Sequence, residues 1–243
     1  MESLNREPFY LNFRELVDKN QTKDIWQAFV FEDDRYIIEI VKEPAEYPLY
    51  FSTRNDLDEW WIILEGSLNI EIDNNEPCIA KMGNVINIES GYHDIHLMTG
   101  SESCIRLIIN KKIGVIALGS VNSSYHQPCF YQNTTPINLL DSKFQGSVKK
   151  SNSIPATITI LEDSLNRADL IWDKFPSVNT SDFYSKYDEW HLVLQGDITW
   201  EFGSNNTLIH SHQGDFIFVP KGIEYKVNSN SKKLSLKLSV IKY

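Results

Sequence analysis

Short runs of alternating apolar and polar residues fill most of the 243-residue chain, and clusters of Gly, Asn, Asp and Ser separate them. Such runs are typical of β-strands joined by turns, whereas stretches with the 3.6-residue period of an α-helix are scarce. Short helices are expected at Leu11 to Lys19 and at Ile137 to Phe144. The pattern therefore predicts an all-β protein with a few short helices.

The same pattern occurs twice, about 130 residues apart. Asp58 to Gly66 reads DEWWIILEG and Asp188 to Gly196 reads DEWHLVLQG, and each is followed by an alternating run and an Asn-rich turn. Further along, Gly83 to Gly91 matches Gly214 to Gly222. A repeat of this length indicates two copies of one structural module. We expect two tandem β-barrels.

Composition suggests where these barrels begin and end. Residues 28–112 and 154–243 contain the two copies and are expected to form barrel 1 and barrel 2. Residues 113–153 are rich in turn-forming residues and are expected to be a linker. Residues 1–27 are expected to form a helical or extended N-terminal segment, whose helix lies over barrel 1.

Three of the repeated segments carry a family resemblance. Gly214 to Gly222 resembles the second conserved cupin motif, and Glu59 to Gly66 and Glu189 to Gly196 resemble the end of the first motif. The chain is thus similar to a bicupin, which implies two jelly-roll barrels. Phe31 to Gly66 also resembles the start of 3-hydroxyanthranilate dioxygenase cupins.

The resemblance implies a metal site that this sequence lacks in large part. Metal-dependent cupins place a His-x-His pair before the motif Glu and a third His after the Pro-x-Gly turn. Here only Glu59 and Glu189 remain, and the third position holds Asp94 or Tyr225. We expect no metal cofactor. If one is bound, we expect Fe, Mn, Ni or Zn in barrel 1, held by Glu59, Asp94 and His96.

Strand alternation predicts which side chains point into each barrel. The predicted catalytic residues share suitability for acid-base chemistry, and they are Glu59, His96, Glu189, His191 and Tyr225. The predicted ligand-binding residues are Arg54, Trp61, Asp94, Asp182 and Tyr184. Each of these residues could instead have only a structural role. In that case Glu59 would pair with Arg54, and the histidines would be hydrogen-bonded within the core. By the same alternation His93 is expected to face outward.

Trp60 and Trp190 have the opposite parity to the pocket positions. We expect them to pack against the other barrel or a second subunit, so a homodimer is one expected assembly.

Charge and composition narrow the function classes. The chain has 33 acidic and 23 basic residues and a net charge of −10, which repels nucleic acids and anionic lipid. No secretory signal or bilayer-spanning run is recognised, and three cysteines without a Cys-x-x-Cys pair argue against a disulfide framework. We expect a cytoplasmic protein with a small-molecule ligand and no nucleic-acid or membrane partner.

Three functions are consistent with these features. The first is a metal-independent isomerase, epimerase or dehydratase acting on a small polar metabolite. The second is a non-catalytic ligand-binding or sensory bicupin with a degenerate metal site. The third is a divergent metal-dependent dioxygenase, against which the missing histidines count.

Overall fold

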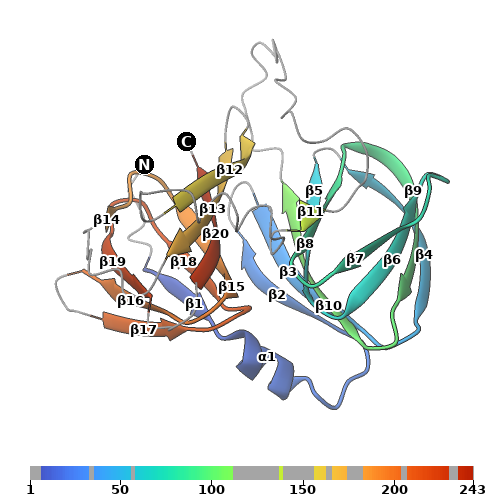
Figure 1. Ribbon diagram of the computed structural model, residues 1–243, viewed down its shortest axis with the longest axis horizontal. Coiled ribbons are helices and arrows are strands. Elements are labelled where there is room, and N and C mark those ends of the chain that lie inside the picture. Colours follow the sequence, from blue (N-terminus) through green and yellow to red (C-terminus); the bar gives the residue numbers. More distant parts are fainter. Residues whose placement is uncertain are drawn as a thin grey trace, which may run out of the picture. The chain divides into compact units, whose positions relative to one another are not determined.

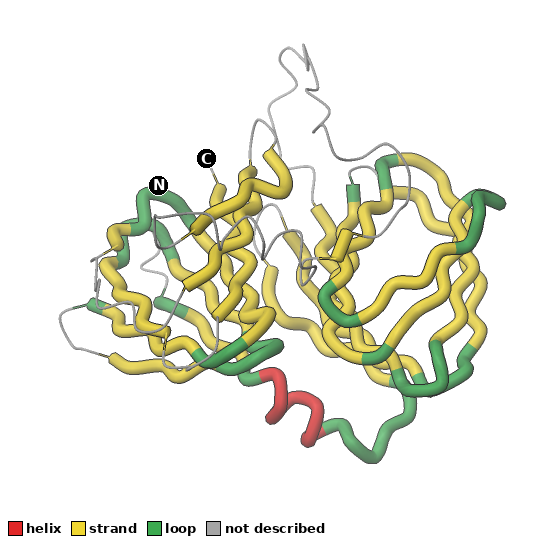
Figure 2. Tube along the Cα trace, in the orientation of Figure 1, coloured by secondary structure: helices red, strands yellow, loops and turns green. Residues whose placement is uncertain are grey.

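The computed structural model describes residues 7–32, 36–55, 58–111, 137–138, 156–162, 166–173, 183–203, 207–229 and 235–242. These residues form β-strands and one short helix (Figure 2). The chain divides into two compact units, which we call the first module (residues 20–142) and the second module (residues 1–19 and 143–243). The predicted all-β architecture is confirmed.

The first module contains a six-stranded sheet in the order β11-β8-β5-β10-β3-β2 and a four-stranded sheet in the order β4-β9-β6-β7 (Figure 1). The strands are β2 (Trp26–Glu32), β3 (Tyr36–Glu43), β4 (Pro48–Asn55), β5 (Glu59–Glu65), β6 (Ser67–Ile72), β7 (Cys78–Lys81), β8 (Asn84–Ile88), β9 (Gly91–Thr99), β10 (Cys104–Lys111) and β11 (Ile137–Asn138). Apolar side chains of both sheets meet in one core, which includes Trp61, Ile70, Ile86 and Ile95.

The second module repeats this arrangement, with sheets in the orders β1-β18-β15-β20-β13-β12 and β14-β19-β16-β17. Its elements are β1 (Phe9–Leu11), α1 (Phe13–Lys19), β12 (Ala156–Glu162), β13 (Asn166–Asp173), β14 (Phe183–Tyr184), β15 (Glu189–Gln195), β16 (Ile198–Phe202), β17 (Thr207–Ser211), β18 (Phe216–Val219), β19 (Glu224–Ser229) and β20 (Ser235–Lys242). The core includes Val193, Trp200, Ile217 and Tyr225.

The sequence repeat has equivalent local structure in both modules. The turn after β5 and the turn after β15 both place glycine at positive φ, 73° at Gly66 and 80° at Gly196. A Cβ at Gly66 would lie 2.2 Å from the carbonyl oxygen of Ser103, so only glycine fits there. The carboxylates of Asp58 and Asp188 accept backbone N–H groups from the turns that follow β8 and β18.

The N-terminal segment belongs to the second module. β1 pairs antiparallel with β18, and Tyr10 packs against the second-module core. The predicted helix exists as α1, but its expected position over barrel 1 is wrong. Its first residue, Phe13, donates its N–H to the buried Asp215 carboxylate at 2.8 Å and fills the space beside Gly214. Contacts between residues about 200 positions apart decide this placement.

The structure also differs from the predictions at Ile137 and at the two tryptophans, Trp60 and Trp190. Ile137 and Asn138 form β11, which pairs with β8, instead of starting a helix, and residues 139–144 lie outside the described residues. Trp60 and Trp190 are each only 3% exposed within the single chain, so neither is left for a second subunit to cover.

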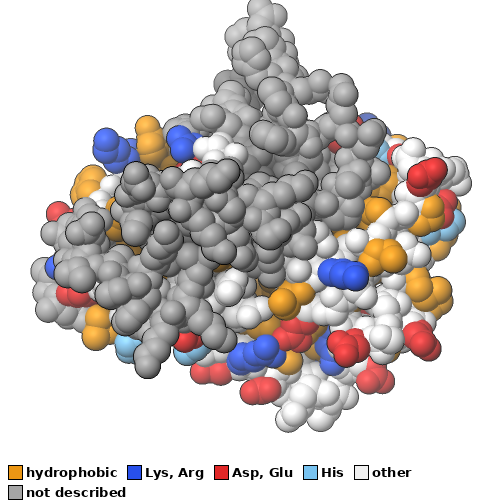
Figure 3. Space-filling view, viewed as in Figure 1, with side chains coloured by type: hydrophobic (Ala, Val, Ile, Leu, Met, Phe, Trp, Pro, Cys, Tyr) orange, Lys and Arg blue, Asp and Glu red, His pale blue; other side chains and the backbone are white. Residues whose placement is uncertain are grey.

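The described helix, α1, has seven residues, far fewer than a bilayer crossing requires, so no helix among the described residues could span a membrane. On the described part of the face in Figure 3, acidic, basic and apolar side chains are interspersed.

Candidate functional site

A carboxylate, an imidazole and a phenol meet inside the second module. Glu189 and His191 lie two residues apart on β15, and Tyr225 lies on β19 in the facing sheet. The Tyr225 hydroxyl donates a hydrogen bond to Glu189 Oε2 at 2.8 Å, and the Ser185 hydroxyl donates to Oε1 at 3.2 Å. His191 Nε2 lies 3.5 Å from Glu189 Oε2. Strand alternation in β15 and the packing of the facing sheet therefore bring three predicted residues together.

His191 is the least solvated of these groups. Its side chain is 1% exposed, and neither ring nitrogen makes a hydrogen bond to a described residue. The 3.5 Å approach to Glu189 is close enough for electrostatic attraction but lacks hydrogen-bond geometry. The ring packs at 4.8 Å from Trp200 and 6.2 Å from Tyr225. The imidazole is thus held by aromatic contacts and by the approach of Nε2 to the Glu189 carboxylate, and neither ring nitrogen has a hydrogen bond within the described residues.

Burial and neighbouring charges set the protonation states of this site. Burial lowers the pKa of His191, and the Lys237 ammonium lowers it further, although Glu189 opposes both. Burial alone would raise the pKa of Glu189, but His191, Tyr225 and Ser185 together hold it below its usual value. Burial and the Glu189 charge raise the pKa of Tyr225. At neutral pH the site holds a neutral imidazole, an ionised carboxylate and a protonated phenol.

The other two residues predicted for this pocket do not join it. Tyr184 is 60% exposed, so its predicted place in the pocket is wrong. Its neighbour Phe183 is opposite Tyr225 in the β14–β19 register and stacks on that ring at 5.6 Å. Asp182 lies outside the described residues.

The first module has a different interior. Glu59 and Trp61 share the inner face of β5, and the Trp61 indole N–H donates to Glu59 Oε1. Arg106 on β10 lies 4.6 Å from the Trp61 ring centre and makes a buried ion pair with Glu43 on β3. The predicted partner of Glu59, Arg54, is exposed on β4 and makes no described contact with Glu59, so that pairing is wrong.

Arg106 and Glu43 were not predicted as site residues. Arg106 is a charged residue in a strand of mostly apolar residues and has the same parity as the core residue Cys104, which is opposite Glu43 in the β3–β10 register. A charge in that position normally needs a buried partner, and this signal was present in the sequence. Burial is the main cause that raises the pKa of Glu59, with Trp61 and Arg106 opposing it.

Asp94 and His96 are on the outer face of β9, contrary to the prediction that they join Glu59. The inward positions of this strand are Ile95 and Leu97, which are buried in the core. His93 shares their parity, so its predicted outward orientation is also wrong. Its ring contacts the Asp73 carboxylate at 2.5 Å and the Glu89 carbonyl oxygen at 2.9 Å. A strand has period two, so an error of one residue exchanges the two faces.

These positions do not fit a transition-metal site. The conditional set of Glu59, Asp94 and His96 is divided between two faces of the first module, and no group of three metal-ligating side chains occurs among the described residues. Among its described residues the second module offers Glu189 and His191, but the buried Lys237 ammonium lies close enough to lower the pKa of His191. Two ligands beside a fixed cation hold a divalent metal poorly.

Arg106 and Lys237 occupy equivalent positions in the two modules. Arg106 pairs with Ile63 and Lys237 with Val193, each four residues after the motif glutamate. Each cation lies over an indole ring, 4.6 Å from Trp61 and 4.7 Å from Trp200. Each module therefore carries a side-chain cation in its interior.

The two motif glutamates should respond oppositely to neutralisation. Because the pKa of Glu59 is raised on folding, its contribution to stability is present below the unfolded pKa of about 4.3 and is lost as the pH rises through the folded pKa. Glu59→Gln should therefore increase the free energy of unfolding at pH 7, by about 1 kcal/mol. Urea denaturation between pH 4 and pH 8 measures this.

Glu189 provides the opposite case. Its pKa is lowered on folding, so its contribution is present above the unfolded pKa and is lost as the pH falls through the folded pKa. Glu189→Gln should decrease the free energy of unfolding at pH 7, by about 1 kcal/mol. Changes of the same sign for both variants would contradict the assigned environments.

Comparison with known proteins identifies the fold. No family model and no curated protein matches the sequence. The structure is similar to a cupin 2 conserved barrel domain protein from Leptotrichia buccalis, with a TM-score of 0.69, 11% identity, and coverage of 98% of this chain and 99% of that chain. It is also similar to salicylate 1,2-dioxygenase from Pseudaminobacter salicylatoxidans, with a TM-score of 0.70, 10% identity, and coverage of 100% of this chain and 87% of that chain.

A mutant form of that dioxygenase, in complex with gentisate, gives a TM-score of 0.70 at 8% identity, with coverage of 99% of this chain and 83% of that chain. At such low identity these similarities show the cupin fold and do not transfer an activity. The predicted cupin resemblance is confirmed at the level of the fold. The closer resemblance to 3-hydroxyanthranilate dioxygenase cupins stays a prediction.

Proposed function

We propose that this chain is a bicupin that binds a small polar metabolite inside the second module and exchanges protons with it without a metal. The reaction class would be an isomerisation, epimerisation or dehydration. The observation that carries the proposal is His191, an imidazole with 1% exposure and no hydrogen-bond partner for either nitrogen among the described residues.

A buried polar group without a partner is costly, at about 1–3 kcal/mol for each donor or acceptor. Native proteins rarely keep such groups unless water, a ligand or a functional requirement accounts for them. A bound molecule with one hydrogen-bond donor and one acceptor would satisfy both nitrogens of a neutral His191. The aromatic rings of Trp200 and Tyr225 would contact its apolar part.

The neighbouring groups suit proton transfer. Glu189 is ionised, and the hydroxyls of Tyr225 and Ser185 fix its orientation, so that it can accept a proton from a bound molecule. Protonated Glu189 can then return that proton at another atom of the ligand, while the N–H of neutral His191 donates a hydrogen bond that stabilises the charge on the intermediate, so both groups end as they began. One proton is removed and one is returned, and no oxidant or reductant is required.

A solvent-exchange experiment tests the proposal. The protein is incubated in D₂O with pyruvate, glyceraldehyde, lactate and other small oxo and hydroxy compounds, and loss of C–H signals is followed by NMR. We expect exchange in at least one compound, slowed about 100-fold or more by His191→Phe. His210→Phe is the matched control, because His210 lies on β17 and contacts Thr199.

Mass spectrometry of small molecules released on denaturation gives a second, independent result. If a released or added compound binds the wild-type protein but not His191→Phe, and none of its C–H groups exchanges with solvent, the protein binds a ligand without catalysis. The catalytic part of the proposal would then be wrong. If no compound is released and none of those added binds, the proposal as a whole is wrong.

A further inference from the structure

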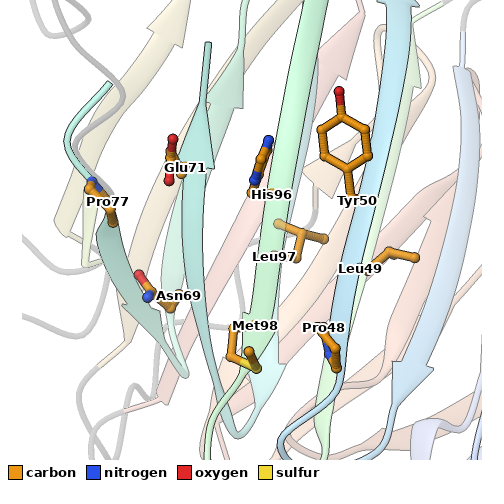
Figure 4. Close-up of a pocket in the computed structure, with 9 residues that line it drawn as sticks. All are labelled: Pro48, Leu49, Tyr50, Asn69, Glu71, Pro77, His96, Leu97 and Met98. Carbon is orange, nitrogen blue, oxygen red and sulfur yellow. The ribbon is translucent and has the colours of Figure 1, made fainter. Parts of the chain in front are cut away.

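A second candidate site lies on the outer face of the first module, separate from the interior described above. The groove has a volume of about 390 Å³ and crosses strands β4, β6 and β9 of the four-stranded sheet (Figure 4). This volume is within the range of small-molecule pockets. Its lining residues are Pro48, Leu49, Tyr50, Asn69, Glu71, Pro77, His96, Leu97 and Met98.

Three polar side chains form one row across the groove. Tyr50 is opposite His96 in the β4–β9 register, and His96 is opposite Glu71 in the β6–β9 register. Figure 4 shows the three side chains next to one another, with their polar ends on the same side. The rings of Tyr50 and His96 meet edge to face at 4.4 Å. A phenol, an imidazole and a carboxylate are therefore available along one line.

The polar side-chain atoms of this row have no hydrogen-bond partner among the described residues. Within the described part of the chain, Tyr50, His96 and Glu71 make no side-chain hydrogen bond or ion pair. The next row of the same face differs, because the Ser52 hydroxyl donates to the Asp94 carboxylate at 2.6 Å. The hydrogen-bonding capacity of the face is thus satisfied beside the groove and unused within it.

Apolar walls complete the groove. Pro48 and Met98 pair in the row next to Tyr50 and His96, and Pro77 also lines the groove. Tyr50 is 60% exposed and Met98 is 44% exposed, so two large side chains with apolar surface face solvent next to each other. An exposed apolar surface with a polar margin is characteristic of a binding site.

The charges of the groove select a cation. Glu71 is the one lining residue with a full charge at neutral pH when histidine is neutral, and the chain as a whole carries a net charge of −10. An anionic ligand would be repelled, whereas an ammonium or guanidinium group would be attracted to Glu71. An alkyl chain attached to that group would extend along the apolar surface of Met98 and Pro48.

We propose that the row of Tyr50, His96 and Glu71 and the apolar walls beside it bind a small alkylammonium or alkylguanidinium compound. The cationic group lies at the Glu71 carboxylate, with a ring nitrogen of His96 as a further acceptor. The alkyl part contacts Met98 and Pro48. This site is independent of the proton-exchange function proposed for the second module.

Titration of the full chain with n-butylamine tests the proposal, with n-butanol and butyrate as uncharged and anionic comparators. NMR shifts of the His96 imidazole and the backbone amides of Leu97 and Met98 report binding. We expect millimolar affinity for n-butylamine, at least about tenfold weaker binding of n-butanol, and no binding of butyrate.

Two variants give the matched comparison. Glu71→Gln should weaken n-butylamine binding about tenfold or more, whereas Asp94→Asn, on the same face but outside the lining, should leave it unchanged. Both should retain the wild-type pattern of backbone amide shifts away from the site. Equal binding of n-butanol and n-butylamine, or equal effects of the two variants, would overturn the proposal.

Discussion

Replacing Asp215 by alanine is expected to lower the free energy of unfolding of the second module by about 3–5 kcal/mol. The Asp215 side chain is 1% exposed and accepts three hydrogen bonds, from the Tyr10 hydroxyl at 2.8 Å and from the backbone N–H groups of Phe13 at 2.8 Å and His212 at 2.7 Å. Alanine would leave these donors without their acceptor and would release the segment that contains β1 and α1.

The effect should appear as a separate early transition in thermal denaturation, because the two modules need not unfold together. For a unit of this size the expected shift is roughly 4 °C per kcal/mol. Asp215→Asn should lower the free energy of unfolding by less than Asp215→Ala does, because the side-chain oxygen of asparagine still accepts a hydrogen bond. At the equivalent turn of the first module, Asn84 accepts such a bond from the Lys81 N–H at 2.6 Å. Asp197→Ala, at an exposed position, is the control.

Amide hydrogen exchange distinguishes local release of β1 and α1 from a loss of stability throughout the protein. Amides of β1 and α1 should lose protection in Asp215→Ala before those of the first module do. Unchanged protection of residues 9–19, or a loss of stability no larger than that of Asp197→Ala, would contradict the role assigned to this carboxylate.

Replacing Arg106 by methionine should destabilise the first module by a similar amount, about 3–5 kcal/mol, because it leaves the Glu43 carboxylate buried without its partner. The side chains of Arg106 and Glu43 are 4% and 5% exposed. The substitution also removes the cation from the face of the Trp61 ring. Urea denaturation monitored by tryptophan fluorescence measures the loss.

A double substitution separates the cost of an unpaired charge from the value of the pair. Glu43→Leu combined with Arg106→Met should recover most of the lost stability, because apolar side chains often replace a buried ion pair at little cost. Arg54→Met, at an exposed position, should change the free energy of unfolding by less than about 0.5 kcal/mol. A double variant as unstable as Arg106→Met would refute this account of the network.

The candidate site of the second module was largely accessible from the sequence. Glu189 and His191 share a face because a strand has period two, and both belong to a run that ends at a glycine turn. Tyr225 was identified from its distance to the Pro-x-Gly turn. The sequence could not reveal that Phe183 instead of Tyr184 would stack on Tyr225, because the short strand β14 has too few residues to define its phase.

In the first module, by contrast, the sequence did not predict which side chains meet in the interior. The strand β9 contains both His93 and His96, so a histidine was available at either parity, and only the packing of Ile95 and Leu97 against the core shows which face is inside. The ion pair of Glu43 and Arg106 joins residues 63 positions apart in sequence. Pairing over that distance depends on sheet order, which local patterns do not define.

By itself the sequence determined the all-β fold class, the internal repeat and the glycine turns, because alternation and turn residues act over a few neighbouring positions. Only the tertiary structure decided that residues 9–19 complete the second module and that Asp94 and His96 lie on the outer face of the first module. It also decided that His191 is buried without a hydrogen-bond partner among the described residues. Each of these depends on which distant strands pair and which faces they bury, and that is settled when the two sheets of each module pack together.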